Sequence, residues 1–537
     1  MILNKESYCK GFLWGVATSA YQAEGGYNGK NQPQTNWARV EKEKDVAPLG
    51  NAAEFWTRYP EDFANCRKMG LSAFRLGLEW SRVQPSLSRK PSQPPTMDGA
   101  ALDHYAEMLI ECRNNGLEPV VTLHHFVHPA WLGDDPWLEP STVDHFIHYV
   151  QSAVLHVNSA LTSRGYPAVR YYITINEPNM LLFNTYLSGQ FPSTAQHGFK
   201  TAIKACCNLL CAHIKAYNVI HDMYETQGWV QPMVSLNNYC SDLYWADKLL
   251  LDLLALREHN IPLKDMNNHV RKKRNAFETS LGAANIPLRK NLSYWFGTFC
   301  KKLTDKLCCL YFDIHGFKPL TDGLLESSRE KVLDYIAVDY YDPFSAHLFR
   351  PPELWDHEFK NKSIHSWLMN TISSKWWDWR VLPQGLRFFC QYYADEFQGR
   401  PILIAENGMA LRRKTNNKNS HRRDRISRSQ FLELHVGEVV NMLNEGIPLI
   451  GYLHWSLFDN YEWGTYTPRF GLYSIDYQRG CDRAPVDHLG DCPSATYAKL
   501  VGLFKSRSPE TDVSVHPPGS AGVSPAEIAA KMASLPG

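Results

Sequence analysis

The sequence predicts an α/β fold in which eight parallel strands, each followed by a helix, close into a barrel. Two observations lead to it: one helix-and-strand unit recurs along the chain, and no Gly-rich loop follows its first strand. The unit is an amphipathic stretch, a Gly near its end and a short apolar run, as in HYAEMLIECRNNG before LEPVVTLHHF. Such a Gly is typical of a helix C-cap, and a continuous apolar run is typical of a strand that helices cover on both faces.

Eight apolar runs qualify as strands. They are Phe12 to Ala20, Ala73 to Trp80, Pro119 to Phe126, Tyr171 to Glu177, Met233 to Tyr239, Tyr335 to Tyr341, Pro401 to Glu406 and Pro448 to Trp455. Eight alternating units favour a closed barrel over an open doubly wound sheet, because a dinucleotide-binding sheet would need a Gly-rich phosphate loop after its first strand. We therefore predict a single (β/α)8 TIM barrel with extended βα loops over residues 1–505.

The composition is that of an ordinary globular protein. Among 537 residues 44% are hydrophobic, and Lys+Arg 56 nearly balances Asp+Glu 55. This excludes disordered and collagenous chains, and nothing suggests a nucleic acid as partner. The N-terminus shows no secretory signal and no run is long and apolar enough to span a bilayer, so we expect a cytoplasmic protein with reduced cysteines.

Two segments depart from the repeat. A basic insertion occupies about residues 241–325, in which Arg257 to Lys306 carries eleven Lys/Arg against four Asp/Glu and includes the cluster Tyr294-Trp295-Phe296. Basic runs are often just solvated faces, and that interpretation stays open here. Residues 506–537 are rich in Pro, Ser, Gly and Ala, which is typical of a disordered C-terminal tail.

Most of the eight runs end in polar or aromatic residues. These are Gln22, Arg75 and Glu79, His124-His125, Asn176-Glu177, Asn237-Asn238, Asp339-Tyr340-Tyr341, Glu406-Asn407 and Trp455. The carboxyl ends of barrel strands form the active-site face, so we expect these side chains to converge on one pocket.

Two carboxylates stand out among these residues. Glu177 in ITINEP and Glu406 in ILIAENG both end strands and both precede sharp backbone breaks. Paired carboxylates at a barrel mouth suit glycosidic-bond cleavage, where one protonates the leaving oxygen and the other attacks or stabilises the sugar carbon. The alternative is structural, because a single Glu at a strand end commonly caps a helix or pairs with an Arg.

The motifs together resemble glycoside hydrolase family 1, the retaining β-glycosidases. They are FLWGVATSAYQAEGG, TLHHF, TINEP, ENG and HWSLFDNYEWGTYTPRFGLY, in family order over roughly residues 9 to 505. The resemblance implies a β-glucosidase-type hydrolase that works by double displacement through a covalent glycosyl-enzyme intermediate. It implies no cofactor and no metal, and we expect none at the HHxxH pattern of His124, His125 and His128.

The resemblance also assigns the catalytic residues. Glu177 would be the general acid/base, with a raised pKa, and Glu406 the nucleophile, which Arg75 keeps ionised. Tyr341 would hydrogen-bond the nucleophile and Asn176 the sugar 2-hydroxyl. A retaining enzyme needs its two carboxyl groups ~5 to 5.5 Å apart.

The sugar-binding residues follow from the same resemblance. Gln22, His125 and Glu462 would bind the 3-, 4- and 6-hydroxyls, Trp455 would lie under the ring, and Trp463 would face a hydroxyl. Buried polar groups built for hydroxyls disfavour analogues that lack them.

The chain departs from the family pattern at three places. Phe126 stands where Trp is common, Asp339 stands where Asn is common, and the loop after Glu462-Trp463 is short and lacks the Ser and Lys with which 6-phosphoglycosidases of this family hold phosphate. Asp339 adds a negative charge that could raise the pKa of a neighbouring carboxylate. We therefore expect a small, unphosphorylated β-D-glucoside as substrate, with β-galactosides and β-fucosides as further candidates.

Three alternatives remain at this point. A transglycosidase would share every catalytic residue, and a non-catalytic sugar-binding protein would normally lack one of the two carboxylates. The third is a glycolipid-directed β-glucosidase with a glucosylceramide- or steryl-glucoside-like substrate. The basic insertion and the loop from Leu411 to Arg428, with eight Lys/Arg and one acid, suggest a positive rim that could contact a membrane peripherally. The oligomeric state is not predicted.

Overall fold

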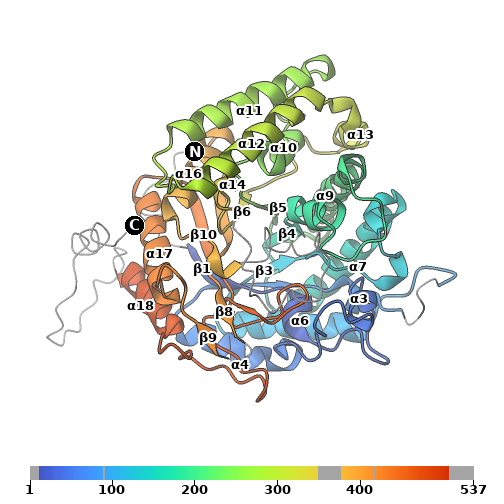
Figure 1. Ribbon diagram of the computed structural model, residues 1–537. Helices are drawn as coiled ribbons and strands as arrows, with labels where there is room; N and C mark the ends of the chain where they lie inside the picture. The colour runs from blue at the N-terminus through green and yellow to red at the C-terminus, as the bar shows by residue number, and fades with distance from the viewer. Residues whose placement is uncertain (1–10, 87, 89–90, 349–375, 415–417, 507–537) are drawn as a thin grey trace.

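The computed structural model describes residues 11–86, 88, 91–348, 376–414 and 418–506. Eight strands form a closed parallel barrel in the order β1-β10-β7-β6-β5-β4-β3-β2, and helices surround it (Figure 1). The predicted fold class is therefore confirmed. The predicted tail, apart from Ser506, lies outside the described residues.

Each of the eight expected runs overlaps one barrel strand, and β3 and β7 each extend one residue beyond the predicted run. The strands are β1 Leu13–Ala17, β2 Ala73–Gly77, β3 Glu118–Thr122, β4 Tyr171–Asn176, β5 Met233–Tyr239, β6 Ile336–Tyr340, β7 Ile402–Asn407 and β10 Leu449–Trp455. The helices that follow them and form the outer layer are α4 Phe55–Lys68, α6 Gly99–Asn114, α7 Ser141–Ser163, α9 Phe199–Gln227, α13 Lys318–Glu326, α16 Pro383–Glu396, α17 Arg428–Asn444 and α18 Pro493–Ser506.

Several strands are shorter than the apolar runs that predicted them. β1 ends at Ala17, and the residues that follow form the short helix α2 (Ala20–Glu24), which carries Gln22. β2 likewise ends at Gly77, before the short helix α5 (Trp80–Val83). The polar residues at the ends of the runs thus leave the strand ladder and turn across the mouth of the barrel, where they meet one another.

Alternation along the strands separates the core into two layers. In β1, Leu13 and Ala17 belong to the packed interior of the barrel, whereas Trp14 and Val16 belong to the larger core between barrel and helices. This is the pattern expected when successive side chains point to opposite faces of a strand. Apolar packing therefore fills the barrel and leaves its carboxyl end for polar groups.

The two strands that carry the candidate carboxylates break this alternation. In β7 the pairing with β6 shifts from Val338↔Ile404 to Asp339↔Glu406, so β7 holds one extra residue there. In β4 the pairing with β5 shifts from Ile173↔Ser235 to Asn176↔Asn237, again with one extra residue on β4. A bulge of this kind re-aims the side chains that follow it. It turns Asn176 and Glu406 toward the barrel axis.

The segment between β5 and β6 contains mostly helices. α10 (Lys248–Leu254) is followed by two long helices, α11 (Met266–Ala283) and α12 (Leu292–Tyr311), which run beside each other on the outside of the barrel (Figure 1). Within the described ranges, no helix has the length and apolarity needed to cross a membrane.

The second basic segment, residues 411–428, is partly buried. Residues 411–428 contribute β8 (Leu411–Arg413) and β9 (Asn419–Ser420) to a small antiparallel sheet with β11 (Pro468–Arg469). Arg422 is buried and donates to the carbonyl oxygen of Trp377, and buried Arg428 pairs with Asp487 at 2.8 Å. Two of the eight cations thus stabilise the fold and cannot contribute to a positive rim.

A buried ion pair joins the first outer helix to the C-terminal part of the chain. Arg483 contacts Asp62 of α4 through two bonds of 2.9 and 2.7 Å, and the two side chains are 1% and 0% exposed. Burial nevertheless raises the pKa of Asp62 to about 6. The neighbouring Asp482 pairs with Arg58 at 3.2 Å, but its side chain is 97% exposed.

We expect Asp62→Ala to lower the free energy of unfolding by about 3–5 kcal/mol at pH 8, because it leaves Arg483 buried and unpaired. The matched control Asp482→Ala removes an exposed partner and should cost less than about 1 kcal/mol. Urea unfolding followed by tryptophan fluorescence measures both. Equal effects of the two substitutions would contradict the argument.

Candidate active site

A fully buried arginine organises the carboxyl end of the barrel. Arg75 of β2 donates through Nε to the Thr122 hydroxyl at 2.9 Å and through Nη2 to Asn176 Oδ1 at 2.5 Å. Its Nη1 donates to Glu406 Oε1 at 2.7 Å and to the carbonyl oxygen of Ala405 at 3.3 Å. One guanidinium group thus links β2, β3, β4 and β7, and it neutralises the charge of a carboxylate buried with it.

Glu406 accepts hydrogen bonds from two donors. Besides Arg75, the hydroxyl of Tyr341 donates to its Oε2 at 2.8 Å. Burial raises the pKa of Glu406, while the charge of Arg75 and the bond from Tyr341 hold this rise down. A carboxylate that accepts charge-assisted bonds is stabilised in its charged state.

Glu177 has a different environment. It follows β4 with φ 36°, a left-handed conformation that is uncommon for a residue with a side chain, and it begins α8 (Pro178–Leu182). No ion pair links it to a cation in the part of the chain that the structure describes. Burial and the negative charge of Glu406 raise the pKa of Glu177 well above its ordinary value.

Asp339 adds a third carboxylate to the site. It is fully buried at the end of β6, directly opposite Glu406 in the strand pairing, and it accepts from Asn237 Nδ2. One oxygen from each of Glu177, Asp339 and Glu406 lies within 4.8 Å of the others. Burial, followed by the charges of Glu406 and Glu177, raises the pKa of Asp339 well above its usual range. The charge of Asp339 was evident from the sequence, but its position within 4.8 Å of both glutamates was not.

One oxygen of Glu177 lies within 4.8 Å of one oxygen of Glu406, so the two carboxyl groups are close together, as the ~5 to 5.5 Å of a retaining enzyme requires. A metal ion needs several His, Cys, Asp or Glu side chains close together. Among the described residues, the three carboxylates of Glu177, Asp339 and Glu406 are the set that meets this condition. The HHxxH histidines do not form such a group. The cation that contacts this cluster is Arg75.

One wall of the site is built for hydroxyl groups. Gln22 Nε2 donates to Glu462 Oε2 at 3.1 Å, and Trp455 Nε1 donates to Glu462 Oε1 at 3.3 Å. Burial raises the pKa of Glu462 to about 8. Gln22 Oε1 and His125 Nδ1 are buried and have no partner among the described residues.

Aromatic rings complete this wall. The ring of His125 stacks on Trp455 and on Trp463, with centroids 5.9 and 5.8 Å apart. Trp463 also contacts Phe126, which replaces the more common Trp, edge to face at 5.0 Å. Burial lowers the pKa of His125 well below its ordinary value, so its imidazole is neutral. All ten predicted site residues therefore lie at the carboxyl end of the barrel or in the loops over it.

The aromatic residues beside Tyr341, which are Tyr239 and Trp379, were missed by sequence reasoning. Tyr341 stacks on Tyr239 at 5.9 Å and contacts Trp379 at 5.3 Å. Trp379 follows the short helix η8 (Trp376–Asp378) and also contacts Trp376. The signal was present in the sequence, because the run KWWDW concentrates three tryptophans in a βα loop.

Some of the expected strand-end residues do not join the group of side chains around Arg75 and the carboxylates. Glu79 accepts from the backbone N–H of Ser81 at the start of α5, and His124 packs edge to face against Trp137 at 5.2 Å. Tyr340 donates its hydroxyl to the carbonyl oxygen of Leu382 in the helix layer. Alternation explains two of these cases, because His124 and Tyr340 each precede a residue of the site, whereas Glu79 lies beyond the end of β2.

Comparisons with known proteins agree with this geometry. The model of glycosyl hydrolase family 1 matches residues 4–242 and 317–488. A 6-phospho-beta-galactosidase of Clostridium acetobutylicum is 24% identical over 482 residues, which cover 87% of this chain and 92% of the relative. The 6-phospho-beta-galactosidase 1 of Streptococcus pneumoniae serotype 4 is 25% identical over 505 residues, covering 87% and 94%.

Solved structures support the fold. A beta-glucosidase from Thermotoga maritima in complex with castanospermine has a TM-score of 0.63 at 19% identity, with 92% of this chain and 98% of that chain covered. The complex of the same enzyme with galacto-hydroximolactam has a TM-score of 0.64. Together with the match of the family model over most of the sequence, this shows that the chain belongs to glycosyl hydrolase family 1 and is an O-glycosyl hydrolase.

Proposed function

We propose that the protein is a retaining β-glycosidase of unphosphorylated β-D-glucosides that also accepts β-galactosides and β-fucosides. The observation that carries the proposal is the contrast between two neighbouring glutamates. Glu406 is bound to Arg75 at 2.7 Å and to Tyr341 at 2.8 Å, whereas Glu177 has no ion-pair partner among the described residues. Different environments give two carboxyl groups the opposite protonation states that the reaction needs.

The first step forms a glycosyl ester. The ionised carboxylate of Glu406 attacks the anomeric carbon while the carboxyl group of Glu177 transfers its proton to the departing glycosidic oxygen. In the second step Glu177, now ionised, takes a proton from water as that water displaces Glu406 from the sugar. Each step inverts the anomeric carbon, so the product keeps the β configuration.

Asn176 is oriented for the 2-hydroxyl of the sugar. Its Oδ1 accepts from Arg75 at 2.5 Å and from Asn237 Nδ2 at 2.9 Å, which fixes the amide plane. Its Nδ2 is then buried without a partner among the described residues and can donate to the sugar. Such a contact, tightened as the oxocarbenium-like state forms, contributes to turnover more than to ground-state binding.

The surroundings of Glu462 favour an unphosphorylated sugar, although the curated relatives are named 6-phospho-beta-galactosidases. The charged groups with the largest effect on the pKa of Glu462 are Glu406 and Asp459, and both are acidic. The raised pKa, about 8, reflects a place where negative charge is costly. A phosphate dianion would meet the same cost next to a carboxyl group that a neutral hydroxyl can bind.

We expect a 2-deoxy-2-fluoro-β-glucoside with a dinitrophenolate leaving group to label the protein once, on the peptide that contains Glu406. Fluorine slows both steps and the good leaving group rescues the first, so the ester accumulates. Intact-protein and peptide mass spectrometry measure the label. The control Glu406→Gln should stay unlabelled, and a label on any other carboxylate would refute the assignment.

The pair of Glu177 and Asp339 should set the alkaline limit of activity. The two side chains hydrogen-bond each other and both have raised pKa values, so they lose protons in coupled steps, the second of which places two charges beside Glu406. In Asp339→Ala the hydrogen-bond donor that lowers the pKa of Glu177 is lost, so Glu177 ionises less easily. We expect the alkaline limb of kcat/KM to move to higher pH by about one unit.

Initial rates on an aryl β-glucoside over a range of pH test this expectation. Thermal unfolding of Asp339→Ala serves as the control for its fold. An alkaline limb that stays in place, in a variant that folds normally, would show that Asp339 does not share the titration of Glu177.

We expect the wild-type protein to hydrolyse 4-nitrophenyl β-glucoside or β-galactoside with a kcat/KM roughly 100-fold above that of the corresponding 6-phosphate, because the phosphate lacks a cationic partner. In Glu462→Ser the ratio should narrow, as the variant loses a hydroxyl partner and a negative charge together. A preference of the wild-type protein for the phosphorylated substrate would overturn this part of the proposal.

A further inference from the structure

Helix α12 (Leu292–Tyr311) turns its apolar side outward. Its exposed residues are Leu292, Trp295, Phe296, Phe299, Lys302, Leu303, Lys306, Leu307, Leu310 and Tyr311. They recur at intervals of three and four residues and therefore form one stripe along the helix. Leu292 is 87% exposed, Trp295 60% and Tyr311 77%. A surface helix normally buries this stripe and exposes its polar face.

The polar side of α12 faces the protein. Asp305 is buried, pairs with Arg274 of α11 and accepts from Trp245 Nε1 at 2.9 Å. Lys301 pairs with Glu278 of α11 at 3.0 Å. The orientation of the helix is thus fixed by specific bonds, and the outward apolar stripe is a property of the folded protein.

The surface around the stripe is cationic. Over residues 263–311 the exposed charged side chains are Lys264, Arg271, Lys272, Arg289, Lys290, Lys302 and Lys306, against one exposed acid, Asp265. Two of these cations, Lys302 and Lys306, lie within the stripe itself. The other described cations of the two helices, such as Lys273 and Arg274, are neutralised by acids.

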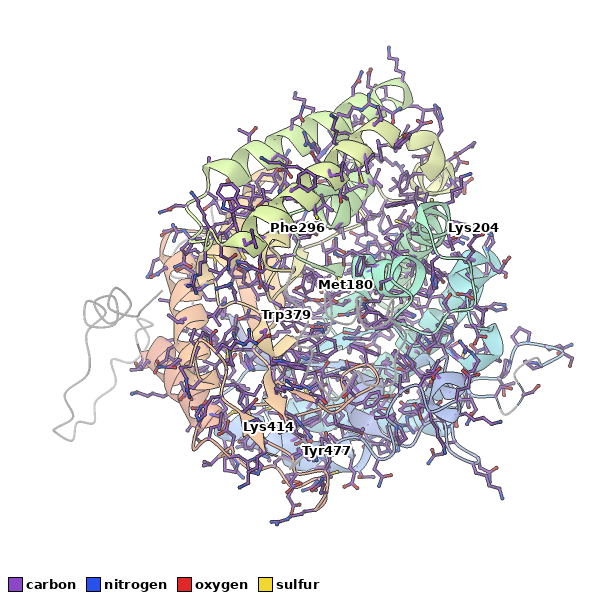
Figure 2. The ribbon with its side chains drawn as sticks, viewed as in Figure 1. Met180, Lys204, Phe296, Trp379, Lys414 and Tyr477 are labelled. Carbon is purple, nitrogen blue, oxygen red and sulfur yellow. The ribbon has the colours of Figure 1, made fainter. Side chains whose placement is uncertain are left out.

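The helix lies against the segment that carries a site residue. A Cβ added at Gly297 would come within 2.4 Å of the Ser345 carbonyl oxygen, so α12 packs closely on α14 (Ser345–Leu348). Ser345 is four residues beyond Tyr341, which binds Glu406. Figure 2 shows Phe296 of α12 in the same region of the view as Met180 of α8 and Trp379, which follow β4 and β6 at the carboxyl end of the barrel.

We propose that the outward stripe of α12 docks the protein on the surface of a membrane that contains anionic lipids. Resting on the proposed glycosidase function, we further infer that the substrate is a β-hexosyl lipid of that membrane, whose sugar enters the barrel while its chains stay in the bilayer. An apolar helix face with Trp and Leu, edged by lysines, is the chemistry that binds at a lipid–water interface. The lysines add attraction to anionic headgroups.

The charges favour a membrane over a second copy of the chain. α12 has no exposed acid, so a copy seated on the same stripe would bring Lys302 and Lys306 near like charges. The family model also leaves residues 243–316 unmatched, and these include all of α11 and α12. The stripe therefore belongs to a part of the chain that the family model does not match.

Cosedimentation of the full chain with lipid vesicles tests the docking surface. The vesicles contain phosphatidylcholine alone or mixed with phosphatidylglycerol, at low and high salt. We expect binding to the mixed vesicles that weakens with salt, and a loss of at least roughly tenfold in affinity for the variant Trp295→Ser/Phe299→Ser/Leu303→Ser. Lys302→Glu/Lys306→Glu should lose a similar factor and most of the salt dependence.

A matched control keeps the test specific. Val230→Ser/Leu155→Ser/Leu503→Ser removes three exposed apolar side chains from other surfaces, which are 77%, 41% and 43% exposed. This variant should bind vesicles like the wild-type protein. Equal loss in the control, or no binding of the wild-type protein to any vesicle, would overturn the docking surface. A dimer in analytical ultracentrifugation that the α12 variant abolishes would assign the stripe to a second copy and overturn it as well.

Activity measurements separate docking from catalysis. All docking variants should hydrolyse a soluble aryl β-glucoside at the wild-type rate, since none of the substituted residues lines the site. On a dialkylglycerol β-glucoside in anionic vesicles the α12 variants should be at least roughly tenfold slower than the control variant. No wild-type activity on the soluble glucoside would refute the glycosidase function while leaving docking intact. Equal rates on the vesicles would refute the lipid substrate.

Discussion

The site depends on one constraint, which is that three carboxylates are buried together with one guanidinium group. Removing charges from water is costly unless they are paired and hydrogen-bonded. Arg75 meets this requirement for Glu406 alone, at 2.7 Å. The remaining two, Glu177 and Asp339, can stay buried by retaining protons. The protonation pattern that a glycosidase requires is therefore a direct result of how few cations the fold places at this end of the barrel.

Much of the fold and site was predictable from the sequence, because both depend on local pattern. Apolar runs marked all eight strands, and their polar ends marked Arg75, Asn176 and Glu406. Pattern alone could not decide which of two adjacent strand-end residues points inward. His124 and His125 look alike in sequence, yet the first packs on Trp137 and the second on Trp455.

The features that escaped prediction depend on contacts between distant segments. Asp339 shares a hydrogen bond with Glu177 because β6 pairs with β7 and β5 lies beside β4, which no single motif encodes. The outward stripe of α12 is a similar case. The sequence showed a basic insertion with an aromatic cluster, but the bonds from Arg274 and Trp245 to Asp305 decide which side of the helix faces the protein.

The extra residue in each of β4 and β7 has a consequence for how the family can change. Asn176 and Glu406 point toward the barrel axis because β4 and β7 each contain one added residue before them. Substitutions along these strands alter packing by degrees, whereas loss of one residue would exchange the inward and outward faces at once. We therefore expect replacements to be tolerated along β4 and β7 and insertions or deletions to be tolerated only in the loops, such as the segment that contains α11 and α12.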